Sequence, residues 1–312
     1  MNGKIKVFLG RFLLVCFLVI VFDQAVGRLL NHFYFKHEPV NHNSTTYVAN
    51  YCDQQVLIFG SSRACYQYIS NEIADKTKLT CFNAGVPGNY ILYSYAMLKC
   101  VLKRYTPKVV VLDIMPDEFK FSQDNYDRLS ILLPYYESHP EIREIIGLKS
   151  KYENLKLLSM IYPFNSFAID IISRNLHTNK NEFRPDGQNG FIPLLDTINQ
   201  PGDKFVNKDY ENYKPDAELL MAYNSFIKEC ISHHIKLFVF ISPILDTHLF
   251  KNNSIKIASN IALKNKIPFL DCTDQQEFKK KIFFKDFGHL NINGARLYTT
   301  EVIRQIKAQS YR

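Results

Sequence analysis

Tryptophan is absent from this chain of 312 residues, and several features that would mark a particular class of protein are weak or missing. Glycine (12) and proline (13) are scarce, which excludes collagenous and low-complexity chains. The net charge is +8 (38 basic minus 30 acidic residues) with no concentrated basic face, so nucleic-acid binding is not indicated. What is present, 46% hydrophobic and 22% charged residues, describes a folded globular chain.

The cysteines also lack a pattern. They are seven in number, which is odd, and they form no Cys-x-x-Cys pair and no Cys/His ligand spacing. Neither a zinc site nor a redox motif is therefore predicted, and we expect no bound metal.

No uncharged apolar run reaches the length of a membrane span, but the N-terminus comes near it. Residues 12–22 are an uncharged apolar run of 11 residues, whereas a spanning helix needs about 20. We therefore expect a span over residues 5–30, with Arg11 and Arg28 reaching toward the two interfaces. Because basic residues precede the run, the pattern predicts a single-pass protein of the cell membrane, with a cytoplasmic N-terminus and an extracytoplasmic body.

Two other interpretations of this segment stay open. Ala25-Val26-Gly27 resembles the small-residue site at which a signal peptide is cleaved. The segment could also be a buried core helix, although nothing else in residues 1–38 would cover it. Unpaired cysteines stand against export into an oxidising compartment. We expect an anchor over residues 1–38, followed by a polar tether over 39–53.

The remainder, residues 54–312, alternates apolar strands with helices. This alternation, with strands rich in Val, Ile, Leu and Phe, predicts an α/β domain with a parallel sheet covered on both faces. Strands are expected over 55–60, 79–83, 108–114, 236–242 and 268–271, and helices over 64–78, 90–105, 216–233, 255–266 and 295–308.

A long segment, residues 117–214, interrupts the alternation. It is rich in Tyr, Phe and Pro, and it leaves the sheet after the third expected strand. Connections of this length usually form a lid or a substrate-binding insertion, because ligands of parallel sheets bind beyond the carboxyl ends of the strands. An independent helical subdomain with no such role is the alternative.

The first chemically suggestive motif is Gly60-Ser61-Ser62-Arg63, at the end of the first expected strand. A serine at a strand-to-helix turn exposes its hydroxyl above the sheet, while the helix N-terminus can face a developing oxyanion. The alternative interpretation is an ordinary N-cap, in which Ser62 binds a helix N–H.

The second motif is Asp286-Phe287-Gly288-His289, just before the last helix. An Asp three residues before a His can accept the imidazole Nδ1–H and fix its tautomer, which leaves Nε2 free to take a proton from a serine. The alternative is a loop Asp with a capping His. The two motifs together favour a catalytic triad of Ser62, Asp286 and His289.

The two motifs, with the block Asn83-Ala84-Gly85-Val86-Pro87-Gly88-Asn89 between them, resemble the SGNH (GDSL-type) hydrolase superfamily. The resemblance covers residues 54–116 and 236–305, and it implies a three-layer, flavodoxin-like parallel sheet. It also implies Ser62 as the nucleophile, with the N–H groups of Ser62 and Gly88 as oxyanion-hole donors.

The sequence departs from that family at two positions. Ser61 stands where the family usually has Asp in its first block. Asp117, in Met115-Pro116-Asp117, stands where the family has an Asn donor, and an ionised carboxylate cannot donate. Asn89 and Arg63 are alternative donors, and all three side chains are candidates for substrate binding.

With its anchor and insertion, the chain resembles membrane-tethered bacterial members of this superfamily. The resemblance implies a serine esterase or O-acyltransferase acting on acyl esters of an extracytoplasmic polysaccharide or other envelope polymer, with no cofactor. The departure at Asp117 motivates an alternative, an envelope protein that keeps the fold but is catalytically impaired and binds glycan or a partner.

Overall fold

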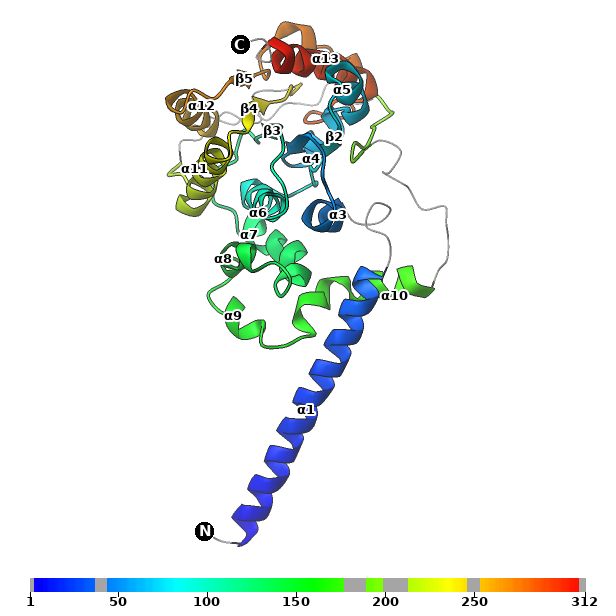
Figure 1. Ribbon diagram of the computed structural model, residues 1–312, viewed down its shortest axis with the longest axis vertical. Helices are drawn as coiled ribbons and strands as arrows, with labels where there is room; N and C mark the ends of the chain where they lie inside the picture. The colour runs from blue at the N-terminus through cyan, green and yellow to red at the C-terminus, as the bar shows by residue number, and fades with distance from the viewer. Residues whose placement is uncertain (1–2, 37–43, 177–188, 199–212, 246–252, 309–312) are drawn as a thin grey trace. The chain divides into compact units, whose positions relative to one another are not determined.

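The computed structural model of the chain is divided by its contacts into two compact units (Figure 1). One joins Met1–Pro39 to Leu129–Glu182, and the other joins Val40–Arg128 to Phe183–Arg312. The segment 117–214 is therefore divided between the two units. Its residues 129–182 belong to the first unit with the N-terminal helix, and the rest belongs to the second unit. The structure describes residues 3–36, 44–176, 189–198, 213–245 and 253–308.

The second unit is built on a parallel sheet of five strands in the order β2-β1-β3-β4-β5, which confirms the expected α/β fold. The first strand lies at an inner position and pairs with both β2 and β3, so the sheet grows outward from β1 on both sides. The strands are β1 Val56–Phe59, β2 Cys81–Asn83, β3 Val109–Asp113, β4 Lys236–Ile241 and β5 Phe269–Asp271.

The central strands are buried on both faces, as their continuous apolar sequences predict. On one face Val56 and Ile58 belong to a core cluster that includes Tyr298 and Val302. On the other face, the ring of Phe59 lies edge-on to that of Phe226 on α11, with 5.7 Å between ring centroids.

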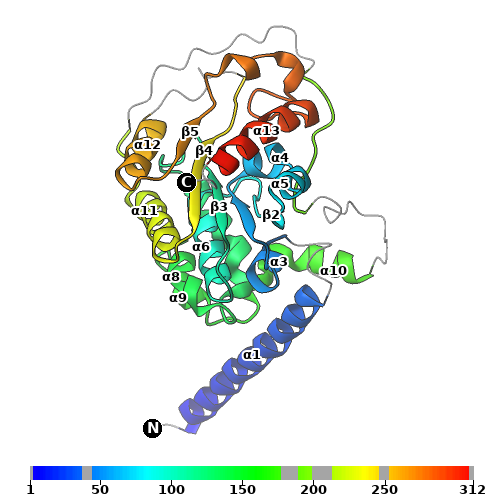
Figure 2. The same ribbon diagram turned by 45° about the horizontal axis from the view of Figure 1, so that its top comes forward.

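Helices cover both faces of this sheet. Figures 1 and 2 show α4, α5 and α13 grouped together, whereas α6 and α11 form a separate group. The helices are α3 Ser44–Asn50, α4 Ser62–Gln67, α5 Ser70–Thr77, α6 Ile91–Leu102, α7 Gln123–Asp127, α11 Ala217–Ser232, α12 Ser254–Lys264 and α13 Ile292–Ala308, with short 3-10 turns at Gln276–Phe278 and Lys281–Phe283.

The expectation of a polar tether over residues 39–53 is wrong for residues 44–50, which lie in the described part of this range. Residues 44–50 form helix α3 and bury Thr45 and Thr46. The hydroxyl of Thr45 lies 2.9 Å from that of Tyr93. The guanidinium of Arg104 donates to the carbonyls of Val48, Ala49 and Cys52. A cation at these carbonyls satisfies acceptors that would otherwise lack partners at the helix end.

The first unit consists of one long helix and several short ones. Helix α1, Gly3–Phe35, is long and apolar enough to cross a membrane, and so fits a candidate span or a signal sequence. Its side chains are exposed through Phe22, with Cys16 half-buried, and become partly covered from Asp23 onward. The other elements are η1 Arg128–Tyr135, η2 Pro140–Ile142, α8 Arg143–Gly147, α9 Glu153–Lys156, η3 Tyr162–Phe167 and α10 Ala168–Leu176.

The covered end of α1 packs closely on the turn that follows α9. The carboxylate of Asp23 accepts hydrogen bonds from the hydroxyl of Ser159 at 2.5 Å and from the backbone N–H of Met160 at 2.8 Å. One turn further along, a methyl group placed on Gly27 would lie 2.3 Å from Cβ of Met160. Glycine is therefore required where the helix meets this backbone.

Replacement of Gly27 by valine is expected to separate α1 from this turn. Overpacking of this kind costs about 1–3 kcal/mol, which corresponds to a roughly 5- to 150-fold faster local opening. Hydrogen exchange of peptides covering 155–176, measured on the full chain, checks the prediction. Gly10→Val is the matched control, because Gly10 lies in the same helix and a methyl group placed on it would have no atom within 4 Å. Equal exchange in both variants would contradict the packing.

The cysteines of the second unit are enclosed by the fold. Six of the chain's seven cysteines are buried, and all seven are free thiols in the structure. Burial raises the pKa of the Cys65 thiol to about 12. Burial likewise raises the pKa of Cys52, Cys81, Cys230 and Cys272. These thiols are therefore protonated at neutral pH.

Candidate active site

The turn between β1 and α4 presents Ser62 at the carboxyl end of the sheet. Gly60 has a φ of +144°, and a side chain there would lie 2.5 Å from the carbonyl oxygen of Asp113. Only glycine fits this conformation and this approach. The chain then passes through the extended residue Ser61 and enters the helix at Ser62. Neither of the two forms the side-chain N-cap that the alternative interpretation expected.

The second motif forms a tight loop before α13. The backbone N–H of Lys285 donates to the carbonyl of His289, which closes the loop. Within it, Oδ1 of Asp286 accepts the backbone N–H groups of Gly288 at 2.8 Å and His289 at 2.9 Å. This carboxylate therefore determines both the shape of the loop and the position of the imidazole.

Side chains of the two motifs lie within hydrogen-bond distance of one another. The hydroxyl oxygen of Ser62 lies 2.8 Å from Nε2 of His289, and Nδ1 of His289 lies 2.9 Å from both carboxylate oxygens of Asp286. Burial tends to raise the pKa of Asp286, but the hydrogen bond and charge of His289 and the two backbone N–H groups outweigh it. The pKa of this carboxyl is thus held below its usual value, and it stays ionised.

Two residues on α4, which sequence reasoning missed, hold the histidine loop in place. Nε2 of Gln67 donates to the carbonyl of Gly288 at 3.1 Å, and the ring of Tyr66 meets the imidazole edge-on with 5.5 Å between centroids. Both follow Ser62 by about one helical turn. The helix that carries Ser62 therefore also positions the imidazole of His289.

The loop after β2 is tied to the same helix. The side-chain amide of Asn83 donates to the carbonyls of Ala64 and Tyr68, and its oxygen accepts the N–H of Gly85. Nδ2 of Asn89 donates to the carbonyl of Pro87 at 3.3 Å, so this amide is engaged within its own loop.

Two backbone donors near the serine remain open. Among the described residues, no hydrogen bond is formed by the backbone N–H of Ser62 or by that of Gly88. Ser62 is the first residue of its helix, where backbone N–H groups have no intrahelical acceptor. The loop of Gly88 is held beside the turn of Ser62 because the N–H of Val86 donates to the carbonyl of Gly60 at 3.1 Å.

Arg63 lies in the core and not on the substrate side. It is 2% exposed, and its guanidinium donates to the hydroxyl of Ser242 at 3.0 Å and to the carbonyl of the same residue. Burial raises the pKa of the neighbouring Asp113, and the positive charge of Arg63 opposes that effect. This placement favours a structural role, joining the turn after β1 to the ends of β3 and β4.

Glu118 connects two of the loops at this edge. Its carboxylate accepts the backbone N–H of Ile91, the first residue of α6, at 2.6 Å and that of Met115 at 2.7 Å. Burial raises the pKa of Glu118 to about 8, although both hydrogen bonds oppose the shift. The loop of Gly88 and the loop after β3 are therefore held by one buried side chain.

A pocket of about 340 Å³ opens beside Gly88. Asp117 lines it together with Gly88, as do Tyr90 and Lys120, which sequence reasoning did not single out. The guanidinium of Arg128 rests directly on the glycine, because a methyl group at Gly88 would lie 2.3 Å from Nη1. The half-exposed cation of Arg128 thus lines the same pocket as the carboxylate of Asp117.

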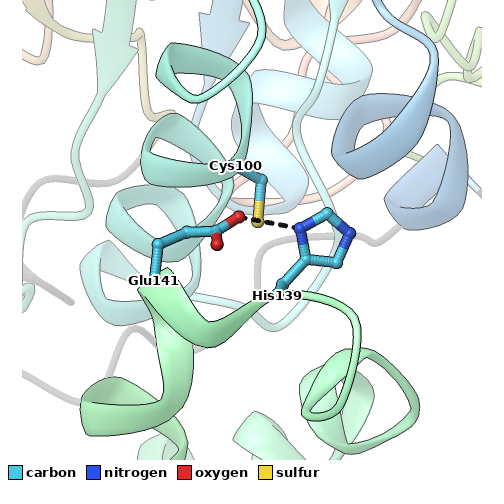
Figure 3. A group of neighbouring side chains, drawn as sticks. All are labelled: Cys100, His139 and Glu141. Carbon is cyan, nitrogen blue, oxygen red and sulfur yellow. Dashed lines mark hydrogen bonds and ion pairs between the residues drawn. The ribbon is translucent and has the colours of Figure 1, made fainter.

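His139 and Glu141 form a separate polar pair in the first unit (Figure 3). Nδ1 of His139 lies 2.8 Å from Oε1 of Glu141. His139 directly precedes η2, which begins at Pro140. Cys100, drawn in the same view, is a residue of the second unit.

A hydroxyl paired with an imidazole, itself oriented by a carboxylate, can attack an acyl carbon and return the proton to a leaving group.

No family model and no curated protein matches the chain.

The fold is similar to those of several solved structures. They include a psychrotrophic esterase from Pseudoalteromonas sp. (TM-score 0.43, 12% identity, 83% of this chain and 100% of that one). A candidate acylhydrolase from Bacteroides fragilis follows (TM-score 0.40, 12% identity, 88% and 100%), then an acetyl xylan esterase (TM-score 0.38, 16% identity, 80% and 99%). At these scores and identities the likenesses are too slight to assign an activity to this chain.

Proposed function

We propose that the chain is a membrane-anchored serine esterase or O-acyltransferase of the SGNH type, acting on acyl esters of an extracytoplasmic polysaccharide or other envelope polymer. The observation that carries the proposal is the 2.8 Å contact between Oγ of Ser62 and Nε2 of His289. This distance is within the reach that general-base catalysis requires.

The reaction would proceed in two stages. In the first, the oxygen of Ser62 bonds to the acyl carbon while its proton passes to Nε2 of His289. The bond to the leaving alcohol then breaks, and His289 returns the proton to that oxygen. In the second, a water or sugar hydroxyl gives its proton to His289 and its oxygen bonds to the acyl carbon. The bond to Ser62 breaks, and the serine regains the proton.

The open N–H groups of Ser62 and Gly88 would stabilise the oxyanion in both stages. Asp117 cannot supply a third donor while ionised, and Asn89 and Arg63 donate elsewhere. We propose the guanidinium of Arg128 as the third donor, because it rests on Gly88.

The anchor and its orientation belong to the same proposal. Helix α1 has the length and the apolar surface of a span, and Lys4, Lys6 and Arg11 precede its apolar run. Basic residues favour the cytoplasmic side. The second unit, with the site, would then lie outside the cytoplasm, where acylated envelope polymers are found.

A fluorophosphonate probe tests the proposal directly. It should form a covalent adduct with the full-length protein, and peptide mapping should place the adduct on Ser62. A short-chain acyl ester, added in excess, should compete with labelling. The absence of any adduct, or an adduct confined to another serine, would count against an acyl-serine intermediate.

Replacement of Arg128 by alanine is expected to lower kcat by about 10- to 100-fold, with a smaller change in KM. We expect a smaller loss of kcat than for removal of a buried oxyanion-hole donor, because Arg128 is half-exposed. Steady-state hydrolysis of an acyl ester measures the effect, and Arg128→Lys should retain part of the activity. Arg296→Ala, which removes an exposed arginine paired with Glu72, is the control. Equal kcat values in Arg128→Ala and Arg296→Ala would show that Arg128 plays no part in the reaction.

A further inference from the structure

Helix α1 divides at Asp23 into an exposed part and a packed part. The exposed part, residues 5–22, comprises 18 residues and would span about 27 Å at 1.5 Å per residue. The hydrocarbon core of a bilayer is about 30 Å thick. If α1 spans a membrane, as proposed above, one face of the bilayer therefore lies near the level of Asp23.

Two elements of the first unit flank the helix at and just beyond this level. Ser159 and Met160, in the turn after α9, donate to Asp23. Further along, the side chain of Asn175 on α10 donates to the carbonyl of Phe33 at 3.3 Å. In Figure 1, α10 runs across the end of α1 and does not continue its direction.

Both elements present large apolar side chains to solvent. On α10, Ile169, Ile172 and Leu176 are 85%, 56% and 73% exposed, and their spacing places them on one face of the helix. Ile171, by contrast, is buried. This exposed face would be costly for a protein surrounded by water alone.

The turn after α9 continues this apolar surface. Leu155 and Leu158 are 65% and 73% exposed, and Leu158 directly precedes the serine that donates to Asp23. These two leucines, with Ile169, Ile172 and Leu176 of α10, are called the apolar surface below. One part of it lies beside Asp23 and the other beside Phe33, so both parts adjoin the packed end of α1.

Basic and tyrosine side chains lie close to the leucines. Lys156 forms an ion pair with the buried Glu153, and the hydroxyl of Tyr162 donates to the same carboxylate. The amine of Lys151 lies 4.7 Å from the ring centroid of Tyr152. Long basic side chains and tyrosines are favoured where an apolar layer meets lipid head groups.

We propose that the apolar surface lies in the interfacial layer of the same bilayer that α1 spans. Helix α10 contacts α1 at Phe33, ten residues or about 15 Å beyond Asp23, so it would rest over the lipid head groups with its isoleucines and Leu176 turned toward the membrane. The first unit would then be held by a transmembrane helix and by a second, monotopic contact. This inference rests on the proposed anchoring of α1.

The absence of tryptophan allows a direct test, because any tryptophan introduced is the sole one in the chain. Leu158→Trp and Ile172→Trp report on the apolar surface. Phe17→Trp, in the exposed part of α1, reports on the anchor. Met221→Trp, on an exposed position of α11 in the second unit, is the control for water.

Each full-length variant is placed in nanodiscs of phosphatidylcholine brominated near the head group or near the chain ends. Leu158→Trp and Ile172→Trp are expected to lose emission about twofold or more with bromine near the head group, and less with bromine near the chain ends. Phe17→Trp should respond more to the deeper bromine. Met221→Trp should be quenched by aqueous acrylamide alone.

The outcomes separate the two proposals. Quenching of Leu158→Trp and Ile172→Trp by acrylamide alone, with Phe17→Trp still quenched by lipid, would overturn the interfacial contact and leave the anchor standing. Protection of the same two variants from both quenchers would overturn it in favour of a protein partner or a second copy. A Phe17→Trp variant that no brominated lipid quenches would remove the anchor itself.

Discussion

Ser62→Ala is expected to lower kcat for ester hydrolysis by about 10⁴- to 10⁶-fold, the loss that follows removal of a nucleophile acting within a triad. The reason is chemical, because without Oγ no acyl-enzyme bond can form and Nε2 of His289 has no hydroxyl to deprotonate. The fold should persist, since deletion of one half-exposed hydroxyl costs about 1 kcal/mol or less. Hydrolysis of an acyl ester, together with fluorophosphonate labelling, measures the effect.

Ser61→Ala is the matched control for that experiment. Ser61 is the immediate neighbour, is buried, and is identical in chemistry. Its replacement should leave labelling of Ser62 intact and change kcat by about tenfold or less. The nucleophile assignment would be wrong if Ser62→Ala kept its labelling and hydrolysed esters at a rate comparable to that of Ser61→Ala.

Asp286→Asn is expected to lower kcat by about 10⁴-fold with the loop intact. An asparagine can keep its oxygen where Oδ1 accepts the N–H groups of Gly288 and His289. Its amide nitrogen would then face Nδ1 of His289, which must become an acceptor. The proton of the imidazole would move to Nε2, and His289 could no longer take a proton from Ser62.

A second aspartate, whose carboxylate also accepts the backbone N–H two residues further on, offers a control. Oδ1 of Asp271, at the end of β5, accepts the backbone N–H and the hydroxyl of Thr273, and among the described residues no imidazole is hydrogen-bonded to it. Asp271→Asn should preserve activity. A comparable loss of kcat in both variants would point to general destabilisation, and an unchanged kcat in Asp286→Asn would falsify the orienting role. Circular dichroism of both variants checks that the fold is retained.

Sequence reasoning worked well where short-range signals dominate. The apolar run at residues 56–59 and the run of valines at 109–111 predict buried parallel strands, because continuous apolar strands must be covered on both faces. The approach of Ser62 to His289 follows from the same logic, since loops at the carboxyl ends of parallel strands meet at one edge of the sheet. The structure places these two side chains within hydrogen-bond distance.

Sequence reasoning failed where a residue distant in the chain determines a local conformation. The sequence of α3 is polar and short, and its carbonyls are satisfied by Arg104, which lies some fifty residues further along the chain. The helix expected over 64–78 is interrupted between α4 and α5, where the N–H of Ile69 donates to the hydroxyl of Thr299. No sequence pattern within either segment predicts these hydrogen-bond partners.

The same limit applies to the site. Gln67 and Tyr66 could have been suspected, because they lie one turn after Ser62 on the helix that carries it. Arg128 could not, because its position against Gly88 depends on how the chain returns after β3. The motif thus predicts the reacting groups, whereas the groups that hold them emerge only from the tertiary structure.

The enclosed thiols would matter for the chain if its second unit lies outside the cytoplasm, as proposed above. Disulfide exchange needs a thiolate, and a thiol such as Cys65, whose pKa burial raises to about 12, carries almost none at neutral pH. Oxidants therefore reach these sulfur atoms mainly during transient openings of the core. Folding itself protects the cysteines of the second unit, so if the chain is exported as proposed, its thiols are most vulnerable between emergence from the membrane and closure of the sheet.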